Sequence, residues 1–181
     1  MRQNHIELKF ADIVFFDASE KSKKEQLVKL LVGDPIHVGI IFTTKPLKIL
    51  HASKQKQEII VEPIENFNEY KLSIYRIKPR YADRLDEKKL FVEALEFIGK
   101  KYGTYTWLTA VLSYCVKLPP HTFGHGDFDK YNPHCSALVS RLYRIAGIDL
   151  RPDLADVLTT PKDLIRSNFI HHIYTVEGSS I

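Results

Sequence analysis

The sequence has little of what builds cross-linked, secreted or membrane-spanning proteins. Only two of its 181 residues are cysteines, Cys115 and Cys135, too few for a disulfide framework, which favours a reducing compartment. The N-terminal residues contain no apolar core of the kind that a signal peptide needs. The longest apolar stretch, residues 105–118, is too short to span a bilayer and indicates a buried or interfacial helix. These absences predict a cytoplasmic protein.

Charge of one sign is also scarce. The net charge is +4, and the lysines are spread along the chain, which is typical of a solvated surface. We therefore expect no nucleic-acid partner, while contact with an anionic membrane surface stays open. The apolar content of 44% and charged content of 27% are ordinary for a globular protein. With no internal repeat and no low-complexity segment, residues 1–181 are expected to form a single domain that buries its core without cross-links.

Apolar periodicity predicts an α+β fold. Alternating or β-rich runs predict strands, and 3.6-residue spacing predicts amphipathic helices. Thr160 and Pro161 are typical of a helix start, and residues 119–133 are rich in Pro, Gly, His and Asp, which predicts a loop. The expected strands are 12–16, 36–42, 47–53, 59–61, 72–77 and 169–176; the expected helices are 21–32, 86–101, 105–118, one that follows Cys135, and a short one from 160. We expect a small, mostly antiparallel sheet packed against helices.

Cys135 is the residue with the clearest chemical potential. It follows Pro133, and Leu138, Leu142 and Ile145 recur after it at helical spacing up to Gly147. This places Cys135 at or near a helix N-terminus, where unpaired N–H groups and the helix dipole stabilise an anion. A thiolate there is expected to have a lowered pKa and to act as a nucleophile. The alternative interpretation is a small buried apolar side chain.

A catalytic thiol needs an imidazole nearby, and His37 is the leading candidate. On the expected strand 36–42, His37 shares a face with Gly39, whose missing side chain lets another group approach. If the hairpin turn is centred near residues 44 and 45, the position opposite His37 is 51 or 52, and His51 is there. Opposed residues lie about 5 Å apart on one face, so His51 is expected to orient His37. Either histidine could instead be an ordinary half-buried polar residue.

A metal site is the rival interpretation of the same region. His121, His125, His134 and Cys135 have ligand-type side chains. Their spacing matches no zinc pattern, so we expect neither a metal nor another cofactor.

Several short motifs resemble, in their joint order, the circularly permuted branch of the papain-like NlpC superfamily. In this branch the histidine strand precedes the cysteine helix, as His37 precedes Cys135. The look-alikes are the YiiX/YaeF-like hydrolases, a related poxvirus family and, more distantly, lecithin:retinol acyltransferase-like proteins. The resemblance covers most of the chain and is carried by segments 11–15, 37–40, 49–53, 97–103, 135–139, 146–150 and 160–164.

The resemblance implies a permuted papain-like (NlpC-type) fold and an activity. Cys135 resembles the family nucleophile and His37 its general base, while His51 occupies the third polar position, which is often glutamate. The implied function is a cysteine hydrolase that cleaves an amide or ester through a thioacyl-enzyme, with the backbone N–H of Cys135 as an oxyanion donor. Neutral His51 would orient its partner more weakly than a carboxylate does.

Two further functions stay open at this stage. A lipid acyl hydrolase or acyltransferase would use residues 105–118 to line an acyl pocket, although such a segment is more often a core helix. A binding module on the same scaffold would have no turnover. The expected partner is a small-molecule, peptide or lipid acyl substrate, and the sequence does not define the oligomeric state.

Overall fold

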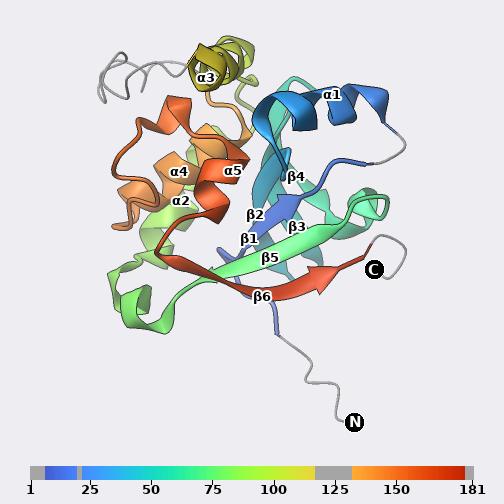
Figure 1. The fold of residues 1–181 in the computed structure, drawn as a ribbon. Helices are drawn as coiled ribbons and strands as arrows, with labels where there is room; N and C mark the ends of the chain where they lie inside the picture. The colour runs from blue at the N-terminus through green and yellow to red at the C-terminus, as the bar shows by residue number, and fades with distance from the viewer. Residues whose placement is uncertain (1–6, 20–21, 117–131, 178–181) are drawn as a thin grey trace.

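The computed structural model describes residues 7–19, 22–116 and 132–177. Figure 1 shows the arrangement of its elements. The strands are β1 (Ile13–Phe16), β2 (His37–Thr44), β3 (Leu47–Ser53), β4 (Glu58–Pro63), β5 (Leu72–Ile77) and β6 (Ile170–Val176). The α-helices are α1 (Lys23–Val32), α2 (Glu87–Phe97), α3 (Thr104–Val116), α4 (Cys135–Ile145) and α5 (Pro161–Ile165), with short 3-10 turns at Ile64–Phe67, Pro79–Arg84 and Asp156–Leu158.

All five strand pairings of the sheet are antiparallel, in the order β4-β3-β2-β1-β5-β6. Because β1 lies between β2 and β5, its four residues are buried on both faces, which explains the continuous apolar run IVFF. The α+β class and the antiparallel sheet expected from the sequence are confirmed.

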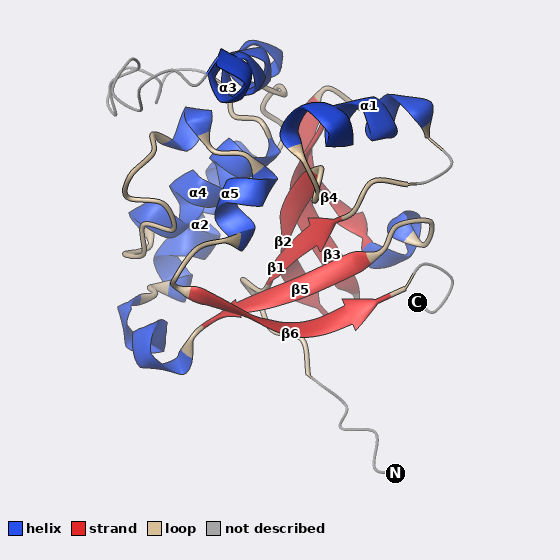
Figure 2. Ribbon diagram, viewed as in Figure 1, coloured by secondary structure: helices blue, strands red, loops and turns tan. Residues whose placement is uncertain are grey.

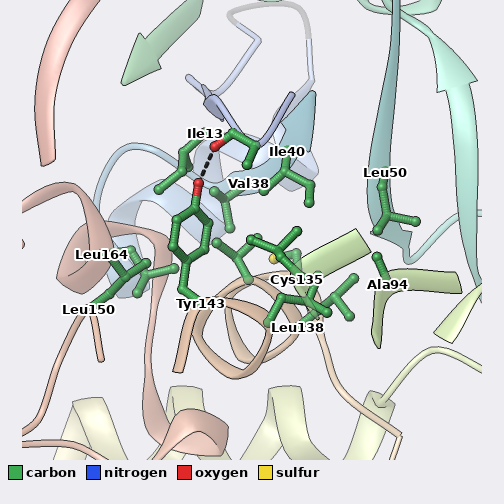
Figure 3. Packing of buried hydrophobic residues seen from close by; sticks show 14 of the residues in the cluster. Ile13, Val38, Ile40, Leu50, Ala94, Cys135, Leu138, Tyr143, Leu150 and Leu164 are labelled. Carbon is green, nitrogen blue, oxygen red and sulfur yellow. Dashed lines mark hydrogen bonds between the residues drawn. The ribbon is translucent and has the colours of Figure 1, made fainter. Parts of the chain in front are cut away.

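Helices α2, α4 and α5 gather on one side of the sheet (Figure 2). The core on that side joins β1, β2 and β3 to α2 and α4, and Figure 3 shows its centre. There the Tyr143 hydroxyl of α4 donates to the carbonyl of Ala11, just before β1. A smaller cluster on the opposite face contains Phe16, Ile41, Ile49 and Phe67. Helices therefore pack on one face of the sheet, and the short 3-10 segment Ile64–Phe67 packs on the other.

Helix α4 is the central helix of the molecule. Its first eight residues are all buried except Arg141, which is half-buried. Its polar side chains are used internally: Ser136 Oγ donates to the Thr159 carbonyl at 2.7 Å, and Ser140 Oγ donates to Asp156 Oδ1 at 2.7 Å. These bonds and the apolar packing hold the first turn, and with it Cys135, in a fixed position.

One expected helix boundary needs correction. Helix α2 ends at Phe97, not near residue 101, because Gly99 adopts a φ of 84° and the chain turns to let Lys101 pair with Glu58 beside β4. Most of the expected 119–133 loop lies outside the described residues. Within the described part of the chain, the helices are too short or too polar to cross a bilayer.

Candidate active site

The site forms where β2 and β3 stop pairing. Their ladder ends at Ile40 and Leu50, although β2 continues beside β1 to His37 and β3 continues beside β4 to Ser53. The last three residues of β3 therefore have no ladder partner in β2. At this end of the sheet, backbone groups and side chains of both strands are available to a third element.

The register of the hairpin differs from the expected one. Phe42 lies at a β-bulge between the pairs Ile41–Ile49 and Thr43–Lys48, and this extra residue shifts the pairing. Continued at the same register, Gly39 and not His37 stands opposite His51. A Cβ on Gly39 would lie 2.8 Å from the Leu50 carbonyl oxygen and 3.1 Å from His51 Cβ. The close approach predicted for Gly39 is confirmed, and the approaching groups belong to Ile49, Leu50 and His51 of β3.

His37 and His51 still meet, because the register shift keeps them on one face. His37 Nε2 lies 2.9 Å from His51 Nδ1. His51 Nε2 in turn lies 2.9 Å from Glu62 Oε2 of β4, whose Oε1 accepts from Lys56 Nζ at 2.6 Å. We call the hydrogen-bonded set His37, His51 and Glu62 the histidine relay.

The relay fixes where the protons sit. Burial alone would raise the pKa of Glu62, but hydrogen bonds from Lys56 and His51 outweigh it and lower that pKa, so Glu62 is a carboxylate and accepts. His51 therefore carries its proton on Nε2, and the neutral ring accepts at Nδ1 from His37 Nε2. This tautomer leaves the lone pair of His37 on Nδ1.

Burial keeps both imidazoles neutral. Burial lowers the pKa of His37 well below its usual value, and the neighbouring His51 lowers it further. Burial also lowers the pKa of His51, against the opposing effect of Glu62. The rings of Phe16 and Phe67, with centroids 5.0 Å from His37 and 5.3 Å from His51, provide the apolar surroundings.

Cys135 lies at the same end of the sheet as the histidine relay, but on the opposite face of the sheet. The backbone N–H groups of Val38, the residue after His37, and of Ser136 lie at its sulfur and act to lower the pKa of the thiol. Each of these donors favours the thiolate, yet burial dominates and raises the pKa of Cys135 to about 11. The lowered pKa expected at a helix N-terminus is therefore wrong for this site: the donors are present, but Cys135 is only 5% exposed.

One cavity of about 590 Å³ joins these groups, with Cys135, His37, His51 and Glu62 in its lining. Its volume falls in the range of small-molecule sites. The remaining walls come from helices α1 and α3, from the turn after β3, and from aromatic side chains: Phe16, Ser22, Lys24, Glu25, Val28, Ile36, Ser53, Lys54, Gln55, Phe67, Tyr70, Tyr102 and Trp107. The nucleophile candidate and the base candidate thus line the same cavity.

Lys54 brings a positive charge to this cavity. Its Nζ lies 3.6 Å from the ring centroid of Trp107. Burial lowers the pKa of Lys54, and interaction with Cys135 opposes that shift. A thiolate that forms at Cys135 is therefore stabilised by a nearby cation.

The histidine next to Cys135 belongs to the scaffold. His134 is the residue before α4 and is 2% exposed. Its Nε2 donates to the Thr159 carbonyl at 3.1 Å, and its Nδ1 lies 3.3 Å from Thr106 Oγ1. Both nitrogens are thus used within the protein. The other loop histidines considered as ligands, His121 and His125, lie outside the described residues.

Glu62 is the member of the relay that the sequence reasoning missed. It directly follows the expected strand 59–61, and the pairing of β3 with β4 places His51 opposite Ile60. Glu62, two residues after Ile60, therefore shares a face with His51. A pairing argument for the second hairpin, of the kind made for the first, would have found it.

Comparison with known proteins supports the fold. No family model and no curated protein matches the sequence. Among solved structures, the chain is similar to the crystal structure of the metalloprotein YiiX from Escherichia coli O157:H7. The match has a TM-score of 0.65 over 95% of this chain and 99% of that chain, at 15% identity. This chain therefore has a YiiX-like α+β fold, as the resemblance in the sequence implied.

The YiiX structure is described as that of a metalloprotein. Among residues 7–19, 22–116 and 132–177, no three His, Cys, Asp or Glu side chains converge as metal ligands do. His51 uses one nitrogen on His37 and the other on Glu62, so it has no lone pair for a metal. The described residues therefore do not fit a metal centre.

Proposed function

We propose that the protein is a cysteine hydrolase that cleaves an amide or ester through a thioacyl-enzyme. The observation that carries the proposal is the histidine relay, which opens with His37 into the cavity that Cys135 lines. A base held by an orienting group, facing the same cavity as a nucleophile, is an arrangement that can activate a weak nucleophile. Glu62 adds the negative charge that the neutral His51 lacks.

Both reacting groups are neutral before the substrate binds. A pKa of about 11 keeps Cys135 a thiol, and a lowered pKa keeps His37 a free base. His37 Nδ1 takes the thiol proton as the sulfur attacks the substrate carbonyl. The resulting imidazolium donates from Nε2 to His51, and Glu62 stabilises the positive charge through His51. The backbone N–H groups at the start of α4 are the proposed donors to the oxyanion.

The tetrahedral intermediate then breaks down to the thioacyl-enzyme, which water hydrolyses in a second stage. The bond from the carbonyl carbon to the leaving amine or alcohol breaks, His37 returns its proton to that group, and the acyl group stays on sulfur. A water molecule gives a proton to His37 and attacks the thioester. The acid leaves, and the thiolate takes the proton back from His37. No outside oxidant or cofactor enters this sequence.

The substrate class has two candidates. A peptide or small amide fits the cavity volume. A lipid acyl group is favoured by one specific observation: helix α3, which forms a wall of the cavity through Trp107, exposes Leu108 and Leu112. Hydrolysis or transfer of a lipid acyl chain is therefore the second proposed function.

Intact-protein mass spectrometry after incubation with acyl-amide and p-nitrophenyl acyl-ester probes tests the proposal. We expect wild type to gain the mass of one acyl group and Cys135→Ala to gain none. Cys115→Ser is the matched control and should label as wild type does. An unlabelled wild type with all probes, or equal labelling of Cys135→Ala, would identify a binding module without turnover.

A further inference from the structure

Helix α3 exposes large apolar side chains and buries small or polar ones, the reverse of a helix that faces water. Its buried positions include Thr106, Ala110 and Ser113, which are small or polar. Its exposed positions carry large apolar side chains at spacings of three and four residues: Tyr105 is 64% exposed, Leu108 57%, Leu112 55% and Val116 54%. A soluble helix buries its apolar stripe instead. The helix also contains no charged residue.

Helix α1 repeats this pattern beside α3. Leu27, Leu30 and Leu31 form one face of α1, and Leu30 is 81% exposed. The two helices contact each other and lie at the same end of the molecule (Figure 1). Together their exposed side chains form what we call the apolar face: Leu27, Leu30, Leu31, Tyr105, Leu108, Leu112 and Val116. Exposed apolar side chains gathered on two neighbouring helices mark an interaction site.

Positive charge accompanies the apolar face. Lys23 and Lys24 are exposed on the first turn of α1, and Lys54 stands over Trp107. The acidic residue of that turn, Glu25, is occupied by the backbone N–H of Ser19 and the hydroxyl of Tyr70. Apolar side chains flanked by lysines are the signature of a surface that lies on an anionic bilayer.

We propose that the apolar face docks the protein on the surface of an anionic lipid bilayer. Since α1 and α3 both line the cavity, through Lys24 and Trp107, docking brings the cavity next to the lipid. Helix α3 has only 13 residues, so it lies on the bilayer and does not cross it. The consequence that the acyl substrate is carried by a lipid rests on the proposed function; the docking itself does not.

Vesicle sedimentation tests the docking. The wild-type chain is mixed with vesicles of phosphatidylcholine alone or with added phosphatidylglycerol, and we expect clear binding to the anionic vesicles. Leu108→Ser/Leu112→Ser should weaken that binding about tenfold or more, because two apolar side chains no longer enter the interface. The matched control is Val92→Ser/Leu95→Ser, which changes two exposed apolar residues of α2 and should bind as wild type does.

The charge contribution is measured separately. Lys23→Gln/Lys24→Gln should weaken binding to anionic vesicles by roughly fivefold or more, leave binding to phosphatidylcholine unchanged, and lose its effect at high salt. Trp107 is the single tryptophan and adjoins Leu108. Quenching of its fluorescence by lipids with brominated chains reports docking in the unmodified chain, so the test survives a variant that fails to fold.

The outcomes separate docking from catalysis. Cys135→Ala should bind vesicles as wild type does, and loss of acyl labelling with retained binding would leave the docking in place. Absence of wild-type binding with an unquenched Trp107, or equal binding by the Leu108/Leu112 variant, would overturn it. So would a wild-type dimer in sedimentation velocity that Leu108→Ser/Leu112→Ser converts to a monomer, since the apolar face would then join two copies.

Discussion

Two histidine sites lie close to Cys135, and they differ in one respect. In both, burial lowers the pKa: well below its usual value at His37, and to about 4 at His134. His134 is fully committed to the scaffold through Thr159 and Thr106. His37 has one nitrogen in the relay and keeps a lone pair on the other. A lowered pKa therefore does not distinguish the proposed base His37 from the scaffold residue His134, whereas an uncommitted nitrogen at the cavity does.

The largest expected effect comes from substituting each of these two histidines in turn. His37→Asn removes the base, and we expect the rate of acyl-enzyme formation to fall by about 100-fold or more. His134→Gln keeps a donor for the Thr159 carbonyl and should change that rate by no more than about threefold. Stopped reactions followed by intact-protein mass spectrometry give both rates. A larger loss in the His134 variant, with its fold retained by circular dichroism, would reverse the assignment.

The sequence predicted some features of the fold and of this site but not others. The α+β class, the helix after Cys135 and the shared face of His37 and His51 follow from local periodicity, because strand alternation fixes the face even when the register slips by two. The bulge at Phe42 was not predicted, because the expected hairpin pairs residue for residue, without an extra residue in β2. The pKa of Cys135 was predicted in the wrong direction: the helix start was visible in the sequence, but the depth of burial was not.

A second expected effect concerns stability in acid. The lowered pKa of His134 means that the unfolded chain binds a proton more readily than the folded one as pH falls below about 6.5. Stability is thus fully present above that pH and is lost as pH approaches 4, by an amount on the order of 2–3 kcal/mol from this residue. His37 and His51 act in the same direction. Urea unfolding of wild type at pH 7 and pH 4.5 measures the total loss.

The contribution of His134 is isolated by difference. His134→Gln cannot titrate, so its loss of unfolding free energy between pH 7 and pH 4.5 should be smaller than that of wild type by about 2–3 kcal/mol. Only the change with pH is compared, because the substitution also alters hydrogen bonds at both pH values. If His134→Gln showed the same pH dependence as wild type, His134 would have the same pKa in the folded and unfolded chains.

The smallest expected effect concerns Glu62, which acts at a distance. Glu62→Gln still accepts a hydrogen bond from His51 but no longer stabilises a positive charge. We expect acyl-enzyme formation to slow by roughly tenfold, less than for His37→Asn, because Glu62 touches the base only through His51. Since Glu62 opposes the burial effect on His51, its loss should also lower the pKa of His51, a shift that NMR titration of the ring resolves.

Lys56→Gln provides the matched control for this position. Lys56 Nζ bonds to Oε1 of Glu62, whereas His51 bonds to Oε2, so the variant alters the same carboxylate without removing its charge. Lys56 is exposed, and ion pairs of this kind contribute little. We therefore expect a rate close to that of wild type. If Lys56→Gln and Glu62→Gln slow the reaction equally, with the pKa of His51 unchanged in both, Glu62 supports the strand β4 and takes no part in the relay.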